Sequence, residues 1–459
     1  MTVPDRLAKI LSDDVIALAA LFAEGGHDLY LVGGSVRDAL LGRPISDLDF
    51  TTDARPDRIE ELSASWAHSM YLAGKAFGTI GLVRDGLTYE LTTLRSEVYR
   101  DDSRKPQVTF SESIEEDLSR RDFTVNAMAI KLPITQGFLP EMIDPHGGLA
   151  DLASKLLRAP LDAHTSFGDD PLRMLRLFRF MSTIGFIPEA DAIQAVGEMK
   201  SRLGIISAER IRTEFDKLLL GEGVVVALEA LVLSGLASEF IPELPALAVE
   251  QDPVHKHKDV LAHTIAVVGK TSPRYELRLA ALFHDIGKPA TREFSGGGVS
   301  FHHHDVVGAR MTRARMKDLR YPKTTIEDVS RLVFLHMRPH TYKMGWTDSA
   351  VRRYVRDAGP LLGDLNELVR CDVTTRNAKR ARAISNRIDD LEVRIAELRE
   401  REELDSLRPP IDGNDVMEHL GIPPGREVGM IMKMLLEYRI EHGPYTADEA
   451  YTLIEQRRA

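Results

Sequence analysis

One stretch, LYLVGGSVRDALLGRPISDLDF at residues 29–50, constrains the fold of this chain more than any other. LYLV has the apolar and β-prone composition of a short strand. Gly33 and Gly34 follow it and predict a turn that a residue with a Cβ does not enter cheaply. Gly42 and Pro44 end the next helix early, and the chain returns as a second strand, SDLDF. The stretch therefore predicts a strand–turn–helix–strand unit of an α/β fold.

The second strand carries two carboxylates, because strand alternation puts Asp47 and Asp49 on one face. Such close carboxylates repel each other unless cations lie between them, which is how a two-metal phosphoryl-transfer site holds Mg²⁺. Ser35 is predicted to cap the helix, with Asp38 completing a capping box. Arg37 then lies in the first turn, near any anion held by the glycine amides. The stretch predicts a triphosphate that faces two metal-binding aspartates.

The length and composition of the chain limit which kinds of protein it can be. With 459 residues, 43% of them hydrophobic and 28% charged, we expect a globular protein of several domains. The single Cys371 excludes an intramolecular disulfide and favours a cytoplasmic location. No signal segment begins the sequence, and the most apolar run, near 224–237, is too short to span a bilayer. We therefore expect no membrane partner.

The net charge of -11 argues against a protein that coats DNA, so no DNA partner is expected. Arginines and lysines nevertheless cluster in RCDVTTRNAKRARAISNR at 370–387. That cluster is either a solvated helix face or a contact to a phosphate backbone.

The secondary-structure pattern changes near residue 150. Before it, short strand-like runs alternate with glycines and polar turns; after it, apolar residues recur at three- and four-residue spacing, as in helices. The predicted domains are 1–150, 151–250, 251–383 and 384–459.

Four further motifs narrow the family. They are RRDFTVNAMAI (120–130), DPHGGLADL (144–152), DDPLRMLRLFRF (169–180) and AERIRTE (208–214). Together with Gly-Gly and Asp-x-Asp, they resemble the motifs of class II CCA-adding enzymes. These tRNA nucleotidyltransferases share a family with bacterial poly(A) polymerases, and the resemblance is dense over 25–220.

The resemblance implies an α+β fold, with a small nucleotidyltransferase α/β head of mixed sheet followed by all-helical neck, body, HD and tail domains. It implies template-independent addition of CCA to tRNA from CTP and ATP, with Mg²⁺ held by the catalytic residues Asp47 and Asp49. The implied nucleotide-binding residues are Gly33, Gly34, Arg37, Arg121, Asp122, Asn126, Asp170, Arg173, Arg176 and Arg179.

The choice of C and A is assigned by the resemblance to Asp170 and Arg173, which at i and i+3 of a helix would project as neighbours. Asp only accepts hydrogen bonds and Arg only donates them. Cytosine and adenine both present an amino donor beside a ring acceptor, whereas uracil and guanine present the reverse order. An Asp–Arg pair would therefore leave buried groups unpaired against U and G.

Histidines concentrate in the second half, which resembles an HD-type phosphohydrolase domain. The expected ligands are His263, His284, Asp285, His304, His336 and Asp372. Such mixed nitrogen and oxygen ligands suit Ni²⁺, Mn²⁺, Co²⁺ or Fe. The alternative is a scaffold domain without metal. Four other histidines of this region, His255, His257, His302 and His303, are expected at the surface.

Three alternatives stay open. The first alternative is a bacterial poly(A) polymerase. Such enzymes usually carry an arginine-rich stretch after the catalytic strands, where this chain has GKAFGTIGLV (74–83), which favours the tRNA enzyme. An enzyme that adds only CC is disfavoured by the polar segment 95–110, where the family has a loop needed for the final A, but an A-only enzyme is not excluded. A phosphohydrolase with a nucleotide-sensing head is disfavoured by intact Asp47 and Asp49.

Overall fold

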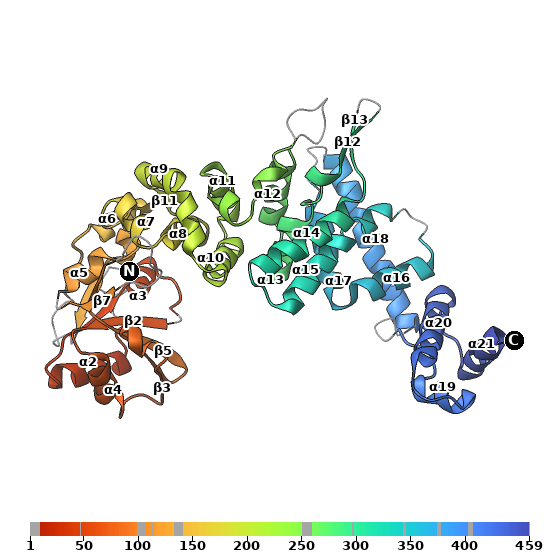
Figure 1. Cartoon of the computed structure of the whole chain (residues 1–459), viewed down its shortest axis with the longest axis horizontal. Coiled ribbons are helices and arrows are strands. Elements are labelled where there is room, and N and C mark those ends of the chain that lie inside the picture. The colour runs from red at the N-terminus through yellow and green to blue at the C-terminus, as the bar shows by residue number, and fades with distance from the viewer. Residues whose placement is uncertain are drawn as a thin grey trace. The chain divides into compact units, whose positions relative to one another are not determined.

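The computed structural model describes residues 10–45, 47–98, 107–111, 113–132, 141–249, 259–295, 298–342, 346–373, 378–402 and 407–458. The chain divides into two compact units, Met1–Phe240 and Ile241–Ala459 (Figure 1). The finer division at residues 150 and 383 stays a prediction.

A seven-stranded sheet with the order β3-β4-β5-β2-β1-β8-β9 forms the head of the first unit. Its strands are β1 (Leu29–Val32), β2 (Asp47–Thr52), β3 (Ser69–Tyr71), β4 (Thr79–Arg84), β5 (Leu87–Thr93), β8 (Ala129–Leu132) and β9 (Met142–Ile143). β2 and β5 pair in parallel and the other neighbours are antiparallel, so the predicted mixed sheet is confirmed. β6 (Arg95–Val98) and β7 (Gln107–Phe110) form a separate hairpin.

The sheet buries one face against the helices α2 (Asp13–Glu24) and α4 (Pro56–Ser63), with which it shares a hydrophobic core. Leu48 and Phe50 of β2 belong to this core. Because side chains alternate along a strand, Asp47 and Asp49 point to the other face, as predicted.

Helices make up most of the rest of the first unit. They are α3 (Gly34–Leu41), α5 (Ile114–Ser119), α6 (Gly148–Ser154), α7 (Ala163–Asp169), α8 (Leu172–Ile184), α9 (Ala190–Met199), α10 (Ala208–Leu220) and α11 (Val224–Leu233). The short strands β10 (Leu156–Leu157) and β11 (Ile187–Pro188) pair in parallel among them. α8 packs against both α10 and α11, and Ser182 of α8 donates a hydrogen bond to the Leu218 carbonyl of α10 at 2.6 Å.

The second unit is helical except for one hairpin among its described residues. Its elements are α12 (Val260–Lys270), α13 (Tyr275–Phe283), β12 (Arg292–Ser295), β13 (Gly298–Phe301), α14 (His304–Asp318), α15 (Lys323–Leu335), α16 (Asp348–Ala358), α17 (Leu362–Cys371), α18 (Ala378–Glu402), α19 (Gly413–Leu420), α20 (Arg426–His442) and α21 (Ala447–Arg458). A buried ion pair between Arg352 and Glu402 joins α16 to α18. Arg439 of α20 donates to the Glu402 carbonyl at 2.8 Å and joins the third helix.

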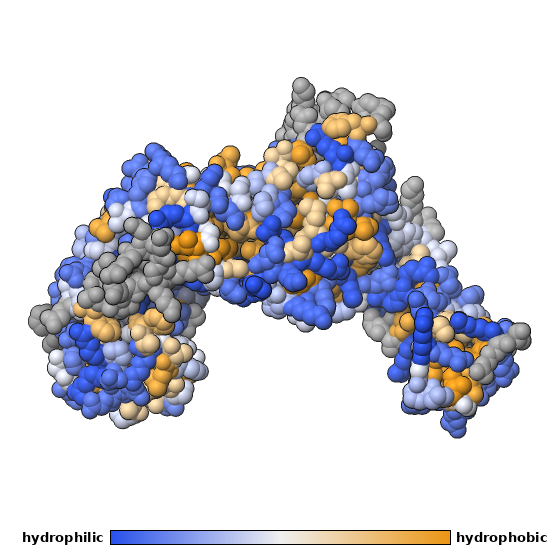
Figure 2. Space-filling model, viewed as in Figure 1, coloured by the Kyte–Doolittle hydropathy of each residue, from blue (hydrophilic) through white to orange (hydrophobic). Residues whose placement is uncertain are grey.

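The described helices include none that combines the length and the apolar character needed to cross a membrane. On the face that Figure 2 shows, hydrophobic residues are interspersed with hydrophilic ones.

Candidate functional site

A cavity of about 340 Å³ opens beside the uncovered face of β2 in the first unit. Ten predicted site residues line it: Gly33, Gly34, Arg37, Asp47, Asp49, Arg121, Asp122, Asn126, Arg176 and Arg179. Residues that the sequence analysis did not assign to the site also line it, chief among them Phe180 and Lys217. Neither Asp170 nor Arg173 does.

The glycine turn admits an arginine into this cavity. Gly33 has a φ of 70° and serves as the N-cap of α3, a conformation that L-residues with side chains rarely adopt. A Cβ at this position would also lie 2.7 Å from Nη1 of Arg121. The positive φ therefore requires glycine at position 33, and a side chain there would also displace the tip of Arg121.

Ser35 does not cap α3, so this prediction is wrong. The helix begins one residue before it, with Gly33 as the N-cap, and Ser35 already lies inside the first turn. Its hydroxyl accepts a hydrogen bond from the Asp49 N–H at 2.9 Å and donates to the Asp47 carbonyl at 3.3 Å. Ser35 thus fixes the backbone that carries both aspartates relative to the glycine turn.

The two aspartates create a local need for positive charge. Burial raises the pKa of Asp49 to about 6, the Asp47 charge adds to this effect, and the Arg121 guanidinium opposes it. A divalent cation between the carboxylates would supply the missing charge, and carboxylate oxygens are the donors that Mg²⁺ prefers. The donor set therefore fits the expected ion.

Three arginines gather around one aromatic ring in the cavity wall. The guanidinium carbons of Arg37, Arg176 and Arg179 lie 5.1, 5.7 and 4.0 Å from the centre of the Phe180 ring. Glu214 forms ion pairs with Arg176 at 3.4 Å and Arg179 at 3.1 Å. A ring and a carboxylate thus hold together cations that would otherwise repel one another.

A chain of hydrogen bonds fixes the polar side chains at the base of the cavity. Arg37 donates to the Asn126 side-chain oxygen at 2.5 Å, and the Asn126 amide donates to Asp122 at 2.9 Å. Asp122 also accepts two hydrogen bonds from Arg176, at 2.8 and 2.5 Å. Burial alone would raise the pKa of Asp122, but Arg176 and Asn126 hold it well below its usual range. These residues form a rigid, charged surface suited to an anion.

The predicted Asp170–Arg173 pair is not formed in this structure. Asp170 has extended backbone and α8 begins only at Leu172, because the residue before a proline avoids the helical region. The Asp170 carboxylate pairs with Arg210 at 3.0 Å. Arg173 is buried and donates to the Ser166 hydroxyl at 2.9 Å and to the Arg120 carbonyl. The assumption of helical neighbours at i and i+3 was therefore wrong.

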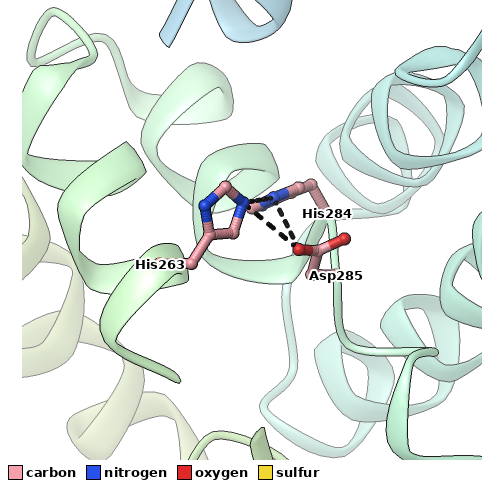
Figure 3. A group of neighbouring side chains, drawn as sticks. All are labelled: His263, His284 and Asp285. Atoms are coloured by element: carbon pink, nitrogen blue, oxygen red, sulfur yellow. Dashed lines mark hydrogen bonds and ion pairs between the residues drawn. The ribbon is translucent and has the colours of Figure 1, made fainter. Parts of the chain in front are cut away.

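The second unit brings all six predicted HD ligands into one cluster. In its first half, Nε2 of His263 lies 3.2 Å from Nε2 of His284 and 3.3 Å from Asp285 (Figure 3). The same nitrogen lies 2.9 Å from Asp372. His284 and Asp285 extend from the end of α13, whereas His263 comes from α12.

Asp285 also belongs to the second half of the cluster, which contains His304 and His336. Oδ1 of Asp285 lies 3.5 Å from Nε2 of His304, and His304 lies 3.3 Å from His336 through their Nε2 atoms. Asp285 therefore bridges two groups of possible ligands, as a two-cation site requires.

Backbone carbonyls orient three of the four imidazoles. Nδ1 of His284, His304 and His336 faces the carbonyls of Ala281, Phe301 and Val333 at 2.8, 2.8 and 2.6 Å, which leaves Nε2 turned into the cluster. Burial lowers the pKa of His336 to about 4, with the His284 charge contributing, and burial also lowers that of His304. Burial alone would lower the pKa of His284, but the Asp285 and Asp372 carboxylates raise it to about 10. His304 and His336 are therefore neutral donors with an oriented Nε2, which suit a transition-metal ion, whereas His284 must lose its proton to bind one.

Sequence reasoning missed Lys288 beside this cluster. Nζ of Lys288 donates a hydrogen bond to Oδ2 of Asp285, three residues earlier in the chain, at 2.6 Å. The HDIGK order of residues carried the signal, because a lysine three positions after a ligand on the same turn reaches back to it.

Other predicted features have mixed outcomes. His302 and His303 are exposed, as expected. His255 and His257 lie outside the described residues, as do positions 99–106 of the polar segment and 374–377 of the basic stretch. Arg370 of that stretch forms ion pairs with Asp389 and Glu392.

Comparison with protein families finds three matching regions. Residues 29–158 match the poly A polymerase head domain, residues 185–247 a probable RNA- and SrmB-binding site of polymerase A, and residues 260–395 the HD domain. The head and HD domains both imply dependence on divalent cations.

Curated relatives carry the name CCA-adding enzyme. The one from Pediococcus pentosaceus is 39% identical over 53% of this chain, and the one from Lactobacillus delbrueckii is 38% identical over 56%. The matches cover 59% and 61% of those relatives, so the chain spans less than two thirds of their length.

Solved structures share the fold over nearly the whole chain. The Bacillus stearothermophilus CCA-adding enzyme in complex with CTP has a TM-score of 0.69 and 24% identity, covering 97% of each chain. The Thermotoga maritima CCA-adding enzyme complexed with tRNA has a TM-score of 0.59 and 18% identity, covering 100% of this chain and 99% of that one. The predicted α+β fold class is confirmed.

The close packing at Gly287 gives a test of the cluster. A Cβ there would lie 2.2 Å from the His304 carbonyl, so Gly287→Ala should push α14 outward and remove His304 from the cluster. We expect reduced binding of Ni²⁺ or Mn²⁺, measured by metal analysis of the purified full chain. Gly363→Ala, where no atom lies within 4 Å of the added Cβ, is the matched control. Unchanged metal content in the Gly287 variant would contradict the assignment of His304.

Proposed function

We propose that this chain, whose first domain belongs to the poly A polymerase head-domain family, adds C, C and A to the 3′ end of tRNA from CTP and ATP. One observation carries the proposal: Asp47 and Asp49 face a glycine turn inside a cavity walled by arginines. The cavity thus combines a site for cations with a site for a triphosphate.

In the proposed reaction, the tRNA 3′-hydroxyl oxygen attacks the α-phosphorus of the nucleotide. A new P–O bond forms, the α–β anhydride bond breaks, pyrophosphate leaves and the hydroxyl proton passes to the carboxylate pair. Mg²⁺ held by Asp47 and Asp49 would neutralise charge on the triphosphate and the attacking oxygen. The guanidiniums of Arg37, Arg176 and Arg179 bind the triphosphate and stabilise the negative charge that develops on the leaving pyrophosphate.

Removing either carboxylate charge tests this reaction. Asp47→Asn and Asp49→Asn preserve size but should lower nucleotide addition by about a thousandfold or more, because each variant loses a metal ligand. The assay incubates the full chain with tRNA lacking its 3′ CCA and with CTP and ATP singly and together, and the products are sequenced. Addition by both variants at the wild-type rate would contradict the assignment.

The same assay separates the alternatives. A poly(A) polymerase would extend the RNA with ATP alone, and an A-only enzyme would act only on tRNA that already ends in CC. Retained tRNA binding by the two variants would show that the loss lies in the chemical step.

Ser35 offers a second test, of geometry rather than charge. Ser35→Ala removes the hydroxyl that links the glycine turn to β2, so the aspartates should shift and kcat should fall by about tenfold to a hundredfold. Ser63→Ala is the control, because it removes a buried hydroxyl bonded to the Ile59 carbonyl of α4 in the same unit. Equal kcat values for the two variants would argue against this role for Ser35.

We further propose that Asp170 and Arg173 read the base once the nucleotide is bound. Both lie on the segment that begins α8, the helix that carries Arg176 and Arg179 of the cavity wall, and the Asp170 partner, Arg210, is 54% exposed at its side chain. Solvent weakens the ion pair at its Arg210 end, so the Asp170 carboxylate can exchange this partner for the amino group of a base.

Asp170→Asn tests the selection, because an amide both donates and accepts. Discrimination against UTP should relax by about tenfold, with a smaller change in the KM for CTP. Asp162→Asn, which alters a carboxylate that caps α7, is the matched control. If misincorporation stayed at the wild-type level in the Asp170 variant, base selection would have to lie elsewhere.

A second activity is favoured by the complete ligand cluster of the HD domain. We propose that it holds Ni²⁺, Mn²⁺, Co²⁺ or Fe and hydrolyses a phosphate ester. The bridging Asp285 and the carbonyl-oriented imidazoles support this proposal, since a scaffold domain needs neither.

Asp285→Ala should separate the two activities. It should abolish Ni²⁺ or Mn²⁺ binding and phosphoester hydrolysis, while CCA addition stays unchanged. Asp318→Ala, at an exposed position on α14, is the control. Metal analysis, hydrolysis and thermal unfolding are measured together, and an Asp285 variant that keeps its metal would contradict the assignment.

A further inference from the structure

The hairpin β12–β13 lies between two ligands of the histidine–aspartate cluster. Asp285 precedes it by seven residues, and His304 follows its last residue, Phe301, by three. Figure 1 shows the two strands as a hairpin of the second unit, side by side. The chain therefore ties the base of the hairpin to the cluster from both sides.

One face of this hairpin carries aromatic rings and a cation. Arg292 pairs with Phe301 across the ladder and Phe294 pairs with Val299, so these four side chains share a face. The Arg292 guanidinium lies over the Phe294 ring, 4.7 Å from its centre. Phe294 itself is 70% exposed.

The row continues to the cluster. Lys288 lies 5.6 Å from the centre of the Phe301 ring and donates to Asp285 at 2.6 Å. The Phe301 carbonyl orients Nδ1 of His304 at 2.8 Å. From the cluster outward, Lys288, Phe301, Arg292 and Phe294 thus alternate cation and ring; we name these four residues the hairpin strip.

At the outer end of the strip, the exposed Phe294 ring lies beside the Arg292 charge. Nε of Arg292 is buried, so it is closed to a ligand, and it has no hydrogen-bond partner among the described residues. No carboxylate is paired with this arginine in the described part of the chain, so the protein leaves its charge uncompensated there. An exposed ring beside a cation provides a stacking surface for a planar base, and the cations match phosphate oxygens.

We propose that the hairpin strip binds a nucleoside phosphate, with the base stacked at Phe294 and the phosphate near Lys288 and the cluster. The ligand is either a free nucleotide or the phosphorylated 3′ end of an RNA strand. The proposal rests on the second activity assigned to the HD domain, and it makes the hairpin the element that selects nucleosidic esters over simple phosphate.

The test uses the full chain loaded with Ni²⁺ and AMP as the probe. Binding is measured by calorimetry with and without Ni²⁺, and Asp285→Ala shows how much AMP the head binds. Phe294→Ala should weaken the Ni²⁺-dependent AMP binding by about fivefold to a hundredfold, the range of one base–aromatic stack. Its affinity for inorganic phosphate should not change. Ser300→Ala, on the opposite face of the hairpin, is the matched control.

The outcomes separate this proposal from the one on which it rests. If Ni²⁺ and phosphate bind but Phe294→Ala leaves AMP affinity unchanged, the hairpin strip is not the recognition site and the metal centre stands. If the wild-type chain binds no Ni²⁺, both proposals fail. If it binds Ni²⁺ but binds AMP equally without it, the hairpin strip is not the recognition site and the metal centre stands. An oligoribonucleotide ending in a 3′-phosphate that binds more tightly than AMP identifies RNA as the source of the ligand, and the reverse order identifies the free nucleotide.

Discussion

Two carboxylates that share one strand face set the electrostatic requirement of the first unit. Because burial and Asp47 raise the pKa of Asp49 to about 6, the pair is costly to keep ionised without nearby positive charge. Arg121 supplies part of that charge, and its guanidinium lies against Gly33, where a Cβ would come within 2.7 Å of Nη1. Asp117 in turn holds Arg121 from behind, at 3.1 Å. One pair of acids thus accounts for the identity of the residues around it.

The same logic extends to the arginine wall. Guanidiniums gathered in one cavity wall repel one another unless other groups stabilise them, and here a ring and nearby acids do so. Phe180 lies near three guanidiniums, while Asp122 and Glu214 pair with Arg176 and Arg179 from the side of the protein. Because these two acids are buried, this part of the cavity keeps a fixed charge pattern, which is what electrostatic preorganisation requires.

Local patterns in the sequence predicted what depends on neighbours along the chain. Strand alternation placed Asp47 and Asp49 correctly, and the glycine turn followed from the need for a positive φ. Predictions failed where a partner lies far away in the sequence. Ser35 bonds to β2 rather than to its own helix, and Arg173 bonds to Arg120, 53 residues earlier. No pattern of spacing encodes such contacts.

For the metal ligands of the second unit, the sequence predicted which residues take part but not how they are arranged. Histidine and aspartate were recognised by resemblance, but the bridging position of Asp285 depends on how α12, α13, α14 and α15 pack. The hairpin that leaves this cluster had no signal in the sequence analysis, since its strands are only four residues long and lie between two ligands.

The two centres differ in the chemistry of their donors. The head offers carboxylate oxygens beside arginines, which suit a hard cation that arrives with a triphosphate. The second cluster offers imidazole nitrogens that backbone carbonyls hold in place, which suit a borderline ion. Because ligand type, rather than affinity alone, selects the ion, one chain can hold two kinds of metal without exchanging them. We therefore expect that a change or loss of ion in the second cluster leaves the charge balance of the head cavity unaltered.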